Sequence, residues 1–339
     1  MTQNSNSMKI GMIGAGRQAE RIGDAIFENK NGEIICVTDI DELKSQKLAA
    51  KYNCKSFKDY KEVINSEIDA VIICTTPKTH AEISISFMKK GIHVLCEKPM
   101  AYTLEEAKKM VEISEEFNVI LQIGFNLKFH PAIKQIKKWY DSNLIGELKF
   151  IRAIYGIGAR PGIKTEWRSN PDIISGGQLM EQGIHCIDLM KMFIEKPSEV
   201  ICYTSNPNSI IEPLEDNVFV TFRTEKSQLV NIHTTLFQWK NKFTFEVFGT
   251  EGYVIAEGLG GSYQMEKAIL GKRDPVAPFE EKIIEYRGKD QSWDLQLNDF
   301  YQNIKDKSEP NNSGKNGYDS LRLVFAAYES QKMKKSISL

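Results

Sequence analysis

The sequence predicts an α/β protein whose first part is a doubly wound parallel sheet. Over residues 1–125, short apolar stretches alternate with helix-forming stretches. The stretch at 69–75 (DAVIICT) is almost continuously apolar, as expected for a strand that helices cover on both faces. This alternation is typical of parallel sheets, because parallel strands need a helical connection. Such sheets bind ligands beyond the carboxyl ends of their strands.

We predict the helices and strands of this part from apolar periodicity and from capping residues. Asp41 is expected to cap the start of the second helix, and Gly91 lies just past the end of the third. We expect strands at residues 8–13, 33–39, 69–75, 92–96 and 119–123, and helices at residues 17–28, 41–52, 79–90 and 104–117.

Strands dominate the second part, from about residue 147. Val218, Val220 and Phe222 alternate with Phe219 and Thr221, which marks two unlike sheet faces. We expect strands at 148–156, 199–205, 217–224, 227–236, 242–249 and 253–257, and helices at 293–305 and 318–332. The chain therefore predicts two domains, residues 1–125 and 126–339, with the helix at 318–332 packing back on the first.

Composition excludes several classes of partner. The 339 residues carry 44 Lys+Arg and 45 Asp+Glu, and this balance provides no field to hold a nucleic acid. No apolar run approaches the roughly 20 residues of a membrane span, and the first seven residues (MTQNSNS) show no apolar signal segment. None of the six cysteines forms a CxxC pair. We expect a cytoplasmic protein with reduced thiols and neither a nucleic-acid nor a membrane partner.

A glycine turn follows the first strand. Gly14 and Gly16, with Arg17, Gln18 and a small Ala19, form G-x-G-x-x-A between a strand and a helix. This pattern permits a tight turn and close approach of a pyrophosphate to the helix N-terminus. Packing of small residues is the alternative reading of the turn.

Asp39 ends the second strand, 23 residues after Gly16. A carboxylate there can accept hydrogen bonds from both ribose hydroxyls and would repel a 2′-phosphate. The turn and Asp39 therefore predict NAD rather than NADP, the alternative being that Asp39 is a solvated strand-end residue.

Two further strand ends carry polar residues at the same predicted edge. After the strand at 69–75 come Thr75, Thr76, Pro77 and His80, which we expect near the nicotinamide; a surface position at a helix start is the alternative for His80. After the strand at 92–96 come Glu97, Lys98 and Pro99. A lysine at this position points into the ligand-binding region, unless it is an ordinary solvated lysine.

A Gly-Gly segment in the second part opens a helix with acid–base residues. Glu181 and His185 are four residues apart on one helix face, and Asp188 follows three residues after His185. An imidazole beside a carboxylate can accept a proton near neutral pH. A metal pair is disfavoured because no third ligand is evident, and a simple helix-face ion pair is the structural alternative.

The chain resembles the Gfo/Idh/MocA family, which includes glucose–fructose oxidoreductase and inositol dehydrogenase, in five segments that occur in the family's order. The segments are GMIGAGRQA at 11–19, CTTPKTHAE at 74–82, CEKPMA at 96–101, GFNLKFHP at 124–131 and SGGQLMEQGIHCIDL at 175–189. The resemblance extends over nearly the whole chain.

The resemblance implies an N-terminal Rossmann domain that binds NAD and a C-terminal α/β domain with a large open, mainly antiparallel sheet. That sheet commonly packs against another subunit, which implies a homodimer or homotetramer. The resemblance also implies that Lys98 is catalytic and that His185 exchanges the proton. Aspartate is frequent in the family where Glu181 stands, so Glu181 either acts in catalysis or only orients His185.

The resemblance also places a loop before the Gly-Gly helix at the substrate. Arg160, Lys164 and Arg168 can pair with a phosphate or uronate, and Trp167 can stack on a sugar ring. Asn126 begins the link to the second domain and is a further substrate candidate. A surface loop with solvated charges is the alternative for residues 159–168.

These features together predict an oxidoreductase that transfers a hydride between nicotinamide and a secondary alcohol of a sugar, polyol or sugar derivative, including phosphorylated and nucleotide-linked ones. Two alternatives stay open on sequence alone: a glycoside hydrolase of the same fold that uses NAD, and a regulator that binds the dinucleotide without catalysis. The pair Lys98 and His185 argues against the regulator, because a sensor does not need proton-transfer groups.

Overall fold

The structure, a computed structural model, describes residues 7–28, 32–207, 209–272, 274–277 and 280–339. Most of the polar N-terminal segment, residues 1–6, lies outside the described residues. The chain divides into two compact units, residues 1–126 with 293–319 and residues 127–292 with 320–339.

The first unit contains the predicted parallel sheet. Its strands run in the order β3-β2-β1-β4-β5-β6 and pair in parallel throughout, which is the doubly wound order expected of a Rossmann domain. Its elements are β1 (Met8–Ile13), α1 (Arg17–Glu28), β2 (Gly32–Thr38), α2 (Glu42–Tyr52), β3 (Lys55–Phe57), α3 (Tyr60–Val63), β4 (Ala70–Ile73), α4 (Pro77–Met88), β5 (His93–Cys96), α5 (Leu104–Glu116), β6 (Leu121–Ile123) and α8 (Ser292–Asp306). The short elements β3 and α3 were not expected, because three or four residues are too few to show a period.

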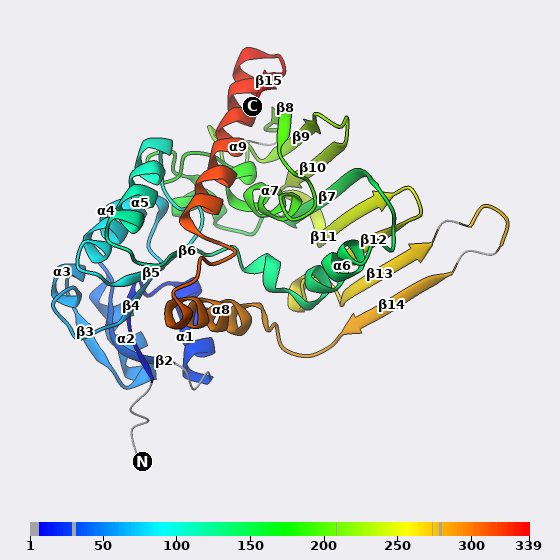
Figure 1. Ribbon diagram of the computed structural model, residues 1–339. Coiled ribbons are helices and arrows are strands. Elements are labelled where there is room, and N and C mark those ends of the chain that lie inside the picture. Colours follow the sequence, from blue (N-terminus) through cyan, green and yellow to red (C-terminus); the bar gives the residue numbers. More distant parts are fainter. Residues whose placement is uncertain (1–6, 29–31, 208, 273, 278–279) are drawn as a thin grey trace. The chain divides into compact units, whose positions relative to one another are not determined.

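The core of this unit joins segments that are far apart in the sequence. Leu297, Phe300 and Tyr301 of α8 pack with apolar residues of α1, β1 and β2, so that α8 lies beside α1 (Figure 1). Helix α9 (Gly314–Met333) begins four residues before its predicted start. Gly314 and Gly317 lie against Leu121 and Ile123 of β6, where any larger residue would collide, so two helix-weakening glycines are retained for close packing.

The second unit is built on a nine-stranded sheet in the order β14-β13-β12-β11-β7-β10-β9-β8-β15. Neighbouring strands are antiparallel except β7 and β10, which confirms the expected large, mainly antiparallel sheet. Its elements are α6 (Pro131–Asp141), β7 (Leu148–Gly158), a π-helical turn (Leu179–Gly183), α7 (Ile184–Met190), β8 (Pro197–Ser205), β9 (Asn217–Thr224), β10 (Leu229–Thr235), β11 (Phe237–Gly249), β12 (Gly252–Glu257), β13 (Glu266–Lys272), β14 (Glu281–Tyr286) and β15 (Ile337–Ser338).

Helices cover one face of this sheet. Helix α6 packs on β12, β13 and β14, and α7 packs on β7 and β10 (Figure 1). Inward side chains such as Phe243, Phe245 and Val247 of β11 are fully or almost fully buried beneath them. Strands β13 and β14 were not predicted, because their charged residues mask the alternation that marks a strand.

The functional division into residues 1–125 and 126–339 stays a prediction. Residues 320–339 cluster with the second unit, and the expected packing of the helix at 318–332 on the first unit also stays a prediction. No helix within the described ranges is long and apolar enough to cross a membrane.

Candidate functional site

The glycine turn of the first unit is shaped by a close backbone contact. Gly14 has φ +97°, and its N–H donates to the Thr38 carbonyl at 2.8 Å. A Cβ on Gly14 would lie 2.7 Å from the Cys74 carbonyl oxygen. Both the backbone conformation and the contact exclude any side chain, so the ends of β1, β2 and β4 meet at this turn.

The second glycine of the turn faces open space. A Cβ on Gly16 would meet no described atom within 4 Å, and helix α1 begins at the next residue, the exposed Arg17. Packing within the described residues therefore does not require a glycine at position 16. The missing side chain leaves room beside free N–H groups at a helix N-terminus. That is the space a pyrophosphate needs, so this turn fits a dinucleotide.

Asp39 lies at the same edge and is held in place by two backbone groups. Its carboxylate accepts from the Ala15 N–H at 2.6 Å and from the Asp41 N–H at 2.8 Å. The side chain is half-buried, and the unused lone pairs of its oxygens can accept from ribose hydroxyls. The fixed negative charge fits a cofactor without a 2′-phosphate.

The Glu97-Lys98-Pro99 segment follows β5 and bonds to the glycine turn. The Glu97 carboxylate accepts from the Gln18 amide at 3.1 Å and from the Lys98 N–H at 3.2 Å. Gly124 makes room for this carboxylate, because a Cβ there would lie 2.9 Å from it. Lys98 is half-buried, and the peptide bond between Lys98 and Pro99 is cis.

His80 connects two of these turns from the interior. Its Nδ1 lies 2.8 Å from the Pro99 carbonyl oxygen, and its Nε2 lies 3.2 Å from the Thr75 carbonyl oxygen. The surface position considered for His80 is wrong, because the ring is fully buried. Burial lowers the pKa of His80 to about 4, so the ring is neutral at pH 7 and donates to one carbonyl at a time. Thr76 is the N-cap residue of α4, and Pro77 is the first residue of that helix.

The acid–base helix of the second unit begins with a π-helical turn, a feature often found at functional sites. Glu181 lies in this turn and His185 in α7, and both side chains are buried. The His185 ring centre lies 6.1 Å from that of Tyr155 on β7. The Asp188 carboxylate is 2.9 Å from the Lys128 amine and accepts from the Ser320 hydroxyl at 3.5 Å.

A buried carboxylate holds the start of this helix. Glu215 accepts from the N–H groups of Gly177 and Leu179 at 2.8 and 3.0 Å, and from the Tyr328 hydroxyl at 2.7 Å. A Cβ on Gly177 would lie 2.0 Å from the Glu215 carbonyl oxygen, and one on Gly176 would collide with Tyr328. The two glycines are therefore required by packing. The sequence did not show this, because Glu215 and Tyr328 lie far along the chain.

Acidic partners accompany both arginines of the loop at 159–168, which was predicted to contact the substrate. Arg160 pairs with Glu166 through two nitrogens, with Nε at 2.8 Å from Oε1. Arg168 lies 3.0 Å from Glu181 and 3.8 Å from Glu166, and its guanidinium stacks 4.1 Å from the Trp167 ring centre. Glu166 was not predicted as a site residue, although it lies between Lys164 and Trp167, which were.

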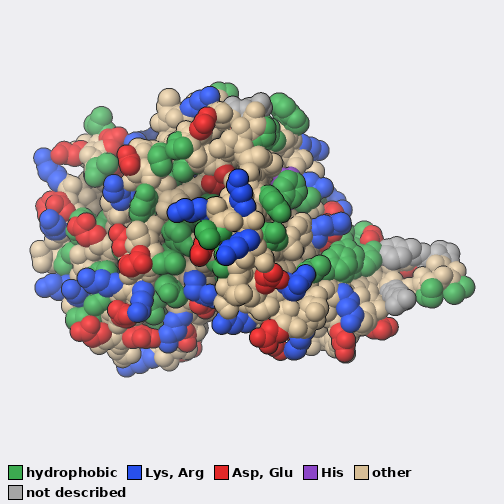
Figure 2. Space-filling model, turned by 90° about the horizontal axis from the view of Figure 1, so that it is seen from above, with side chains coloured by type: hydrophobic (Ala, Val, Ile, Leu, Met, Phe, Trp, Pro, Cys, Tyr) green, Lys and Arg blue, Asp and Glu red, His purple; other side chains and the backbone are tan. Residues whose placement is uncertain are grey.

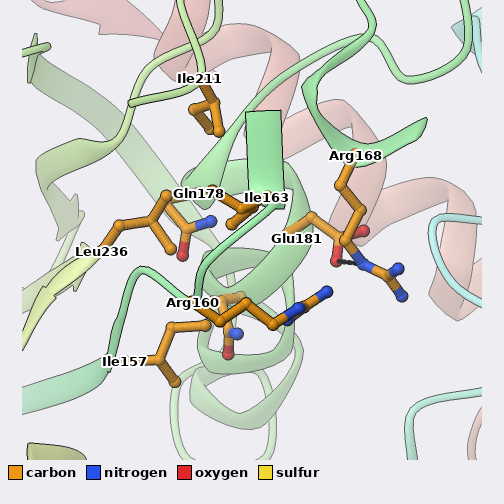
Figure 3. A pocket seen from close by; sticks show the side chains of 9 residues that line it. Ile157, Arg160, Ile163, Arg168, Gln178, Glu181, Ile211 and Leu236 are labelled. Carbon is orange, nitrogen blue, oxygen red and sulfur yellow. Dashed lines mark hydrogen bonds and ion pairs between the residues drawn. The ribbon is translucent and has the colours of Figure 1, made fainter. Parts of the chain in front are cut away.

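The structure thus groups the predicted residues within each unit. The cofactor candidates lie at the carboxyl edge of the parallel sheet. Of the substrate candidates, Lys164 is exposed and Asn126 is buried. In the second unit, the loop and the π-helical turn border a small cavity that is partly open to solvent. The cavity is lined by Ile157, Arg160, Ile163, Arg168, Gln178, Glu181, Gln182, Ile211 and Leu236 (Figure 3). The roles assigned to these residues stay predictions.

The fold and the glycine turn define a dinucleotide-binding α/β protein. A family model described as "Oxidoreductase family, NAD-binding Rossmann fold" matches residues 8–125, and a model of the GFO/IDH/MocA C-terminal domain matches residues 133–255. The chain therefore belongs to the GFO/IDH/MocA family of oxidoreductases, and its first unit is an NAD-binding Rossmann domain. These matches confirm the resemblance seen in the sequence.

Individual relatives are similar over most or all of the chain. Myo-inositol 2-dehydrogenase of Thermotoga maritima is 27% identical, covering 98% of each chain. Glucose-6-phosphate 3-dehydrogenase of Bacillus subtilis is 29% identical, covering 76% of this chain and 71% of that one. The solved structure of levoglucosan dehydrogenase in complex with NADH and levoglucosan superimposes with a TM-score of 0.90, at 21% identity, covering 98% of this chain and 99% of that one. This last similarity shows the shared fold.

The two glycines of the turn should respond differently to alanine. Gly16→Ala should unfold at the same urea concentration as the wild type, because its Cβ meets no described atom. Its affinity for NADH should fall by about tenfold or more, since the methyl group occupies the approach of the pyrophosphate. Gly14→Ala, the matched comparison, should lose stability instead. Fluorescence titration with NADH and urea unfolding measure both effects, and unchanged NADH affinity in Gly16→Ala would contradict the assigned binding mode.

His80 should make stability depend on pH. Because the pKa is lowered to about 4 in the folded state, its stabilising contribution is complete above pH 6.5 and is lost as pH falls toward 4. The contribution amounts to about 3 kcal/mol. His80→Asn should therefore show a flatter pH dependence of the free energy of unfolding than the wild type between pH 5 and 7. Urea unfolding at each pH measures it, and parallel curves for the two proteins would contradict the assignment.

Proposed function

We propose that this protein is an NAD-dependent dehydrogenase that oxidises a secondary alcohol of a sugar, polyol or sugar derivative, or catalyses the reverse reduction. The observation that carries the proposal is a buried imidazole, His185, four residues after Glu181, which lines a cavity with other polar and charged groups in an NAD-binding oxidoreductase. Two relatives are named as dehydrogenases of myo-inositol and of glucose 6-phosphate, and these names support a sugar or polyol as the substrate. The surrounding polar groups suit an alcohol with several hydroxyls.

The cofactor is proposed to be NAD rather than NADP. Gly14, Gly16, Arg17 and Gln18 would hold its pyrophosphate, and Asp39 its ribose. The nicotinamide end of the cofactor would lie near the remaining residues at this edge, which are Thr75, Thr76, Pro77, His80, Glu97 and Lys98. When bound, NAD accepts or supplies the hydride.

Side chains of the protein would transfer the hydroxyl proton and stabilise the negative charge on the reacting oxygen. His185 would take the hydroxyl proton of the substrate during oxidation and return it during reduction. Lys98 would donate a hydrogen bond to the reacting oxygen and stabilise its developing negative charge. Glu181, which is held by Arg168 at 3.0 Å, is assigned a positioning role beside His185. Substrate hydroxyls would contact Arg160 and Arg168, which line the cavity, and also Asn126, Lys164 and Trp167, which lie outside its lining.

The open face of the nine-stranded sheet is proposed as the surface of a homodimer or homotetramer. Apolar side chains are exposed along one side of adjacent strands, and the rings of Phe150 and Phe248 stack there with their centres 4.5 Å apart. The exposed members include Phe150 at 40%, Tyr203 at 65%, Phe219 at 45% and Leu229 at 44%. A second copy of this face would remove these side chains from water.

The proposal also includes a cytoplasmic location and no nucleic-acid partner. On the face drawn in Figure 2, Lys and Arg side chains are interspersed with Asp and Glu side chains. With a net charge of −1, such mixing supports a small-molecule substrate rather than a polyanion. Residues 1–125 would then serve the cofactor, and residues 126–339 the substrate and oligomer contacts.

A substrate screen tests the proposed activity. Sugars, inositols, sugar phosphates and nucleotide sugars are each added with NAD, and NADH formation is followed by absorbance. Net NADH supports a dehydrogenase, whereas cleavage of a glycoside without net NADH would show a hydrolase. Lys98→Met should lower kcat by about 100-fold or more while still binding NADH. Lys90→Met, an exposed lysine of the same unit, is the control. Normal turnover in Lys98→Met would contradict the assignment.

Light scattering tests the oligomeric state. The wild type should have the mass of a dimer or tetramer, and Phe219→Glu should dissociate it, because a charge would be buried within the proposed face. Phe27→Glu changes an apolar residue of the first unit that is 71% exposed and should leave the mass unchanged. A monomeric wild type would refute the proposal.

A further inference from the structure

The charges around the substrate cavity neutralise one another. Arg160 is neutralised by a two-point pairing with Glu166, and Arg168 by Glu181 with a second contact to Glu166. Figure 3 shows the Arg168 guanidinium joined to the Glu181 carboxylate, with the Arg160 side chain extending toward them. Two guanidinium groups and two carboxylates thus form one network. The remaining cation of the loop, Lys164, is exposed and does not line the cavity.

This network is unsuited to an anionic ligand. A phosphate would have to displace Glu166 from Arg160 in order to bind the fork of that guanidinium. The displaced carboxylate would stay close by, because it is covalently attached six residues along the same loop. Repulsion between the two anions and the lost pairing both oppose binding.

Two neutral amide side chains, Gln178 and Gln182, line the cavity together with the charged network. An amide can both donate and accept a hydrogen bond, and a hydroxyl group of a ligand can do the same. Phosphate dianions and carboxylates offer only acceptors. Apolar neighbours such as Ile163 and Leu236 suit the C–H surface of a ring.

We propose that this cavity binds an uncharged polyhydroxylated ligand, a free sugar, anhydrosugar or cyclic polyol, and that Glu166 excludes phosphorylated and carboxylated analogues. Glu166 is then the residue that determines specificity, because its carboxylate pairs with the Arg160 guanidinium and neutralises the charge that an anion would otherwise bind. The inference narrows the substrate class and rests on the proposed dehydrogenase function.

Matched substrate pairs test the preference. Each neutral sugar or polyol is compared with its own phosphate ester at saturating NAD. For the wild type, kcat/KM should be about 100-fold higher for the neutral member. Glu166→Gln should reduce this ratio by about tenfold or more, mainly through a lower KM for the phosphate. Glu195→Gln, which removes an exposed carboxylate paired with Lys226, should leave the ratio unchanged. A wild type that prefers the phosphate would overturn the inference.

A binding measurement separates this inference from the proposed function. With NADH saturating, so that the glycine turn is occupied, inorganic phosphate is titrated by calorimetry against chloride at equal ionic strength. The wild type should show no binding, Glu166→Gln should bind phosphate, and the double variant Glu166→Gln/Arg160→Gln should lose it again. If no substrate yields NADH, the proposed activity fails, and this titration still decides the role of Glu166. Phosphate binding to the wild type, or none to folded Glu166→Gln, would refute that role. If Glu166→Gln does not fold, the wild-type comparisons decide the preference.

Discussion

The first unit depends on one close contact between two stretches of backbone. At the end of β1, Gly14 lies so near the Cys74 carbonyl that no side chain fits between them. This contact brings together the ends of β1 and β4, the point where the strand order reverses and where doubly wound sheets bind ligands. Asp39 then bonds to the N–H of Ala15, and Gln18 to Glu97, so the positions of the cofactor residues follow from this turn.

Buried polar groups position the candidate site residues in both units. His80 contacts the carbonyls of Thr75 and Pro99, while Glu215 accepts from the first N–H groups of the helix that carries His185. Each group is removed from solvent, where an unmade hydrogen bond is costly. The segments next to Lys98 and His185 are therefore fixed by interactions whose geometry tolerates little displacement.

The sequence predicted the parts of the fold and the site that depend on local pattern. Gly14, Gly16 and Asp39 were found because strand ends and turn residues are marked by neighbours a few positions away. Strands β13 and β14 were missed because their charged residues obscure the alternation. Glu166 was missed because its role depends on how a loop folds onto Arg160, and no periodicity records that. Glu215 acts on residues 38 and 113 positions away, which a single sequence does not reveal.

The hydrogen bond from Tyr328 to Glu215 gives the C-terminal helix a part in supporting the acid–base helix. Tyr328 also fills the space beside Gly176, and Ser320 of the same helix bonds to Asp188. Shortening the chain from its carboxyl end would therefore remove more than a peripheral element. The resulting damage would spread to the helix that carries the imidazole, because Glu215 would lose a donor and the glycine pair would lose the ring that it packs against.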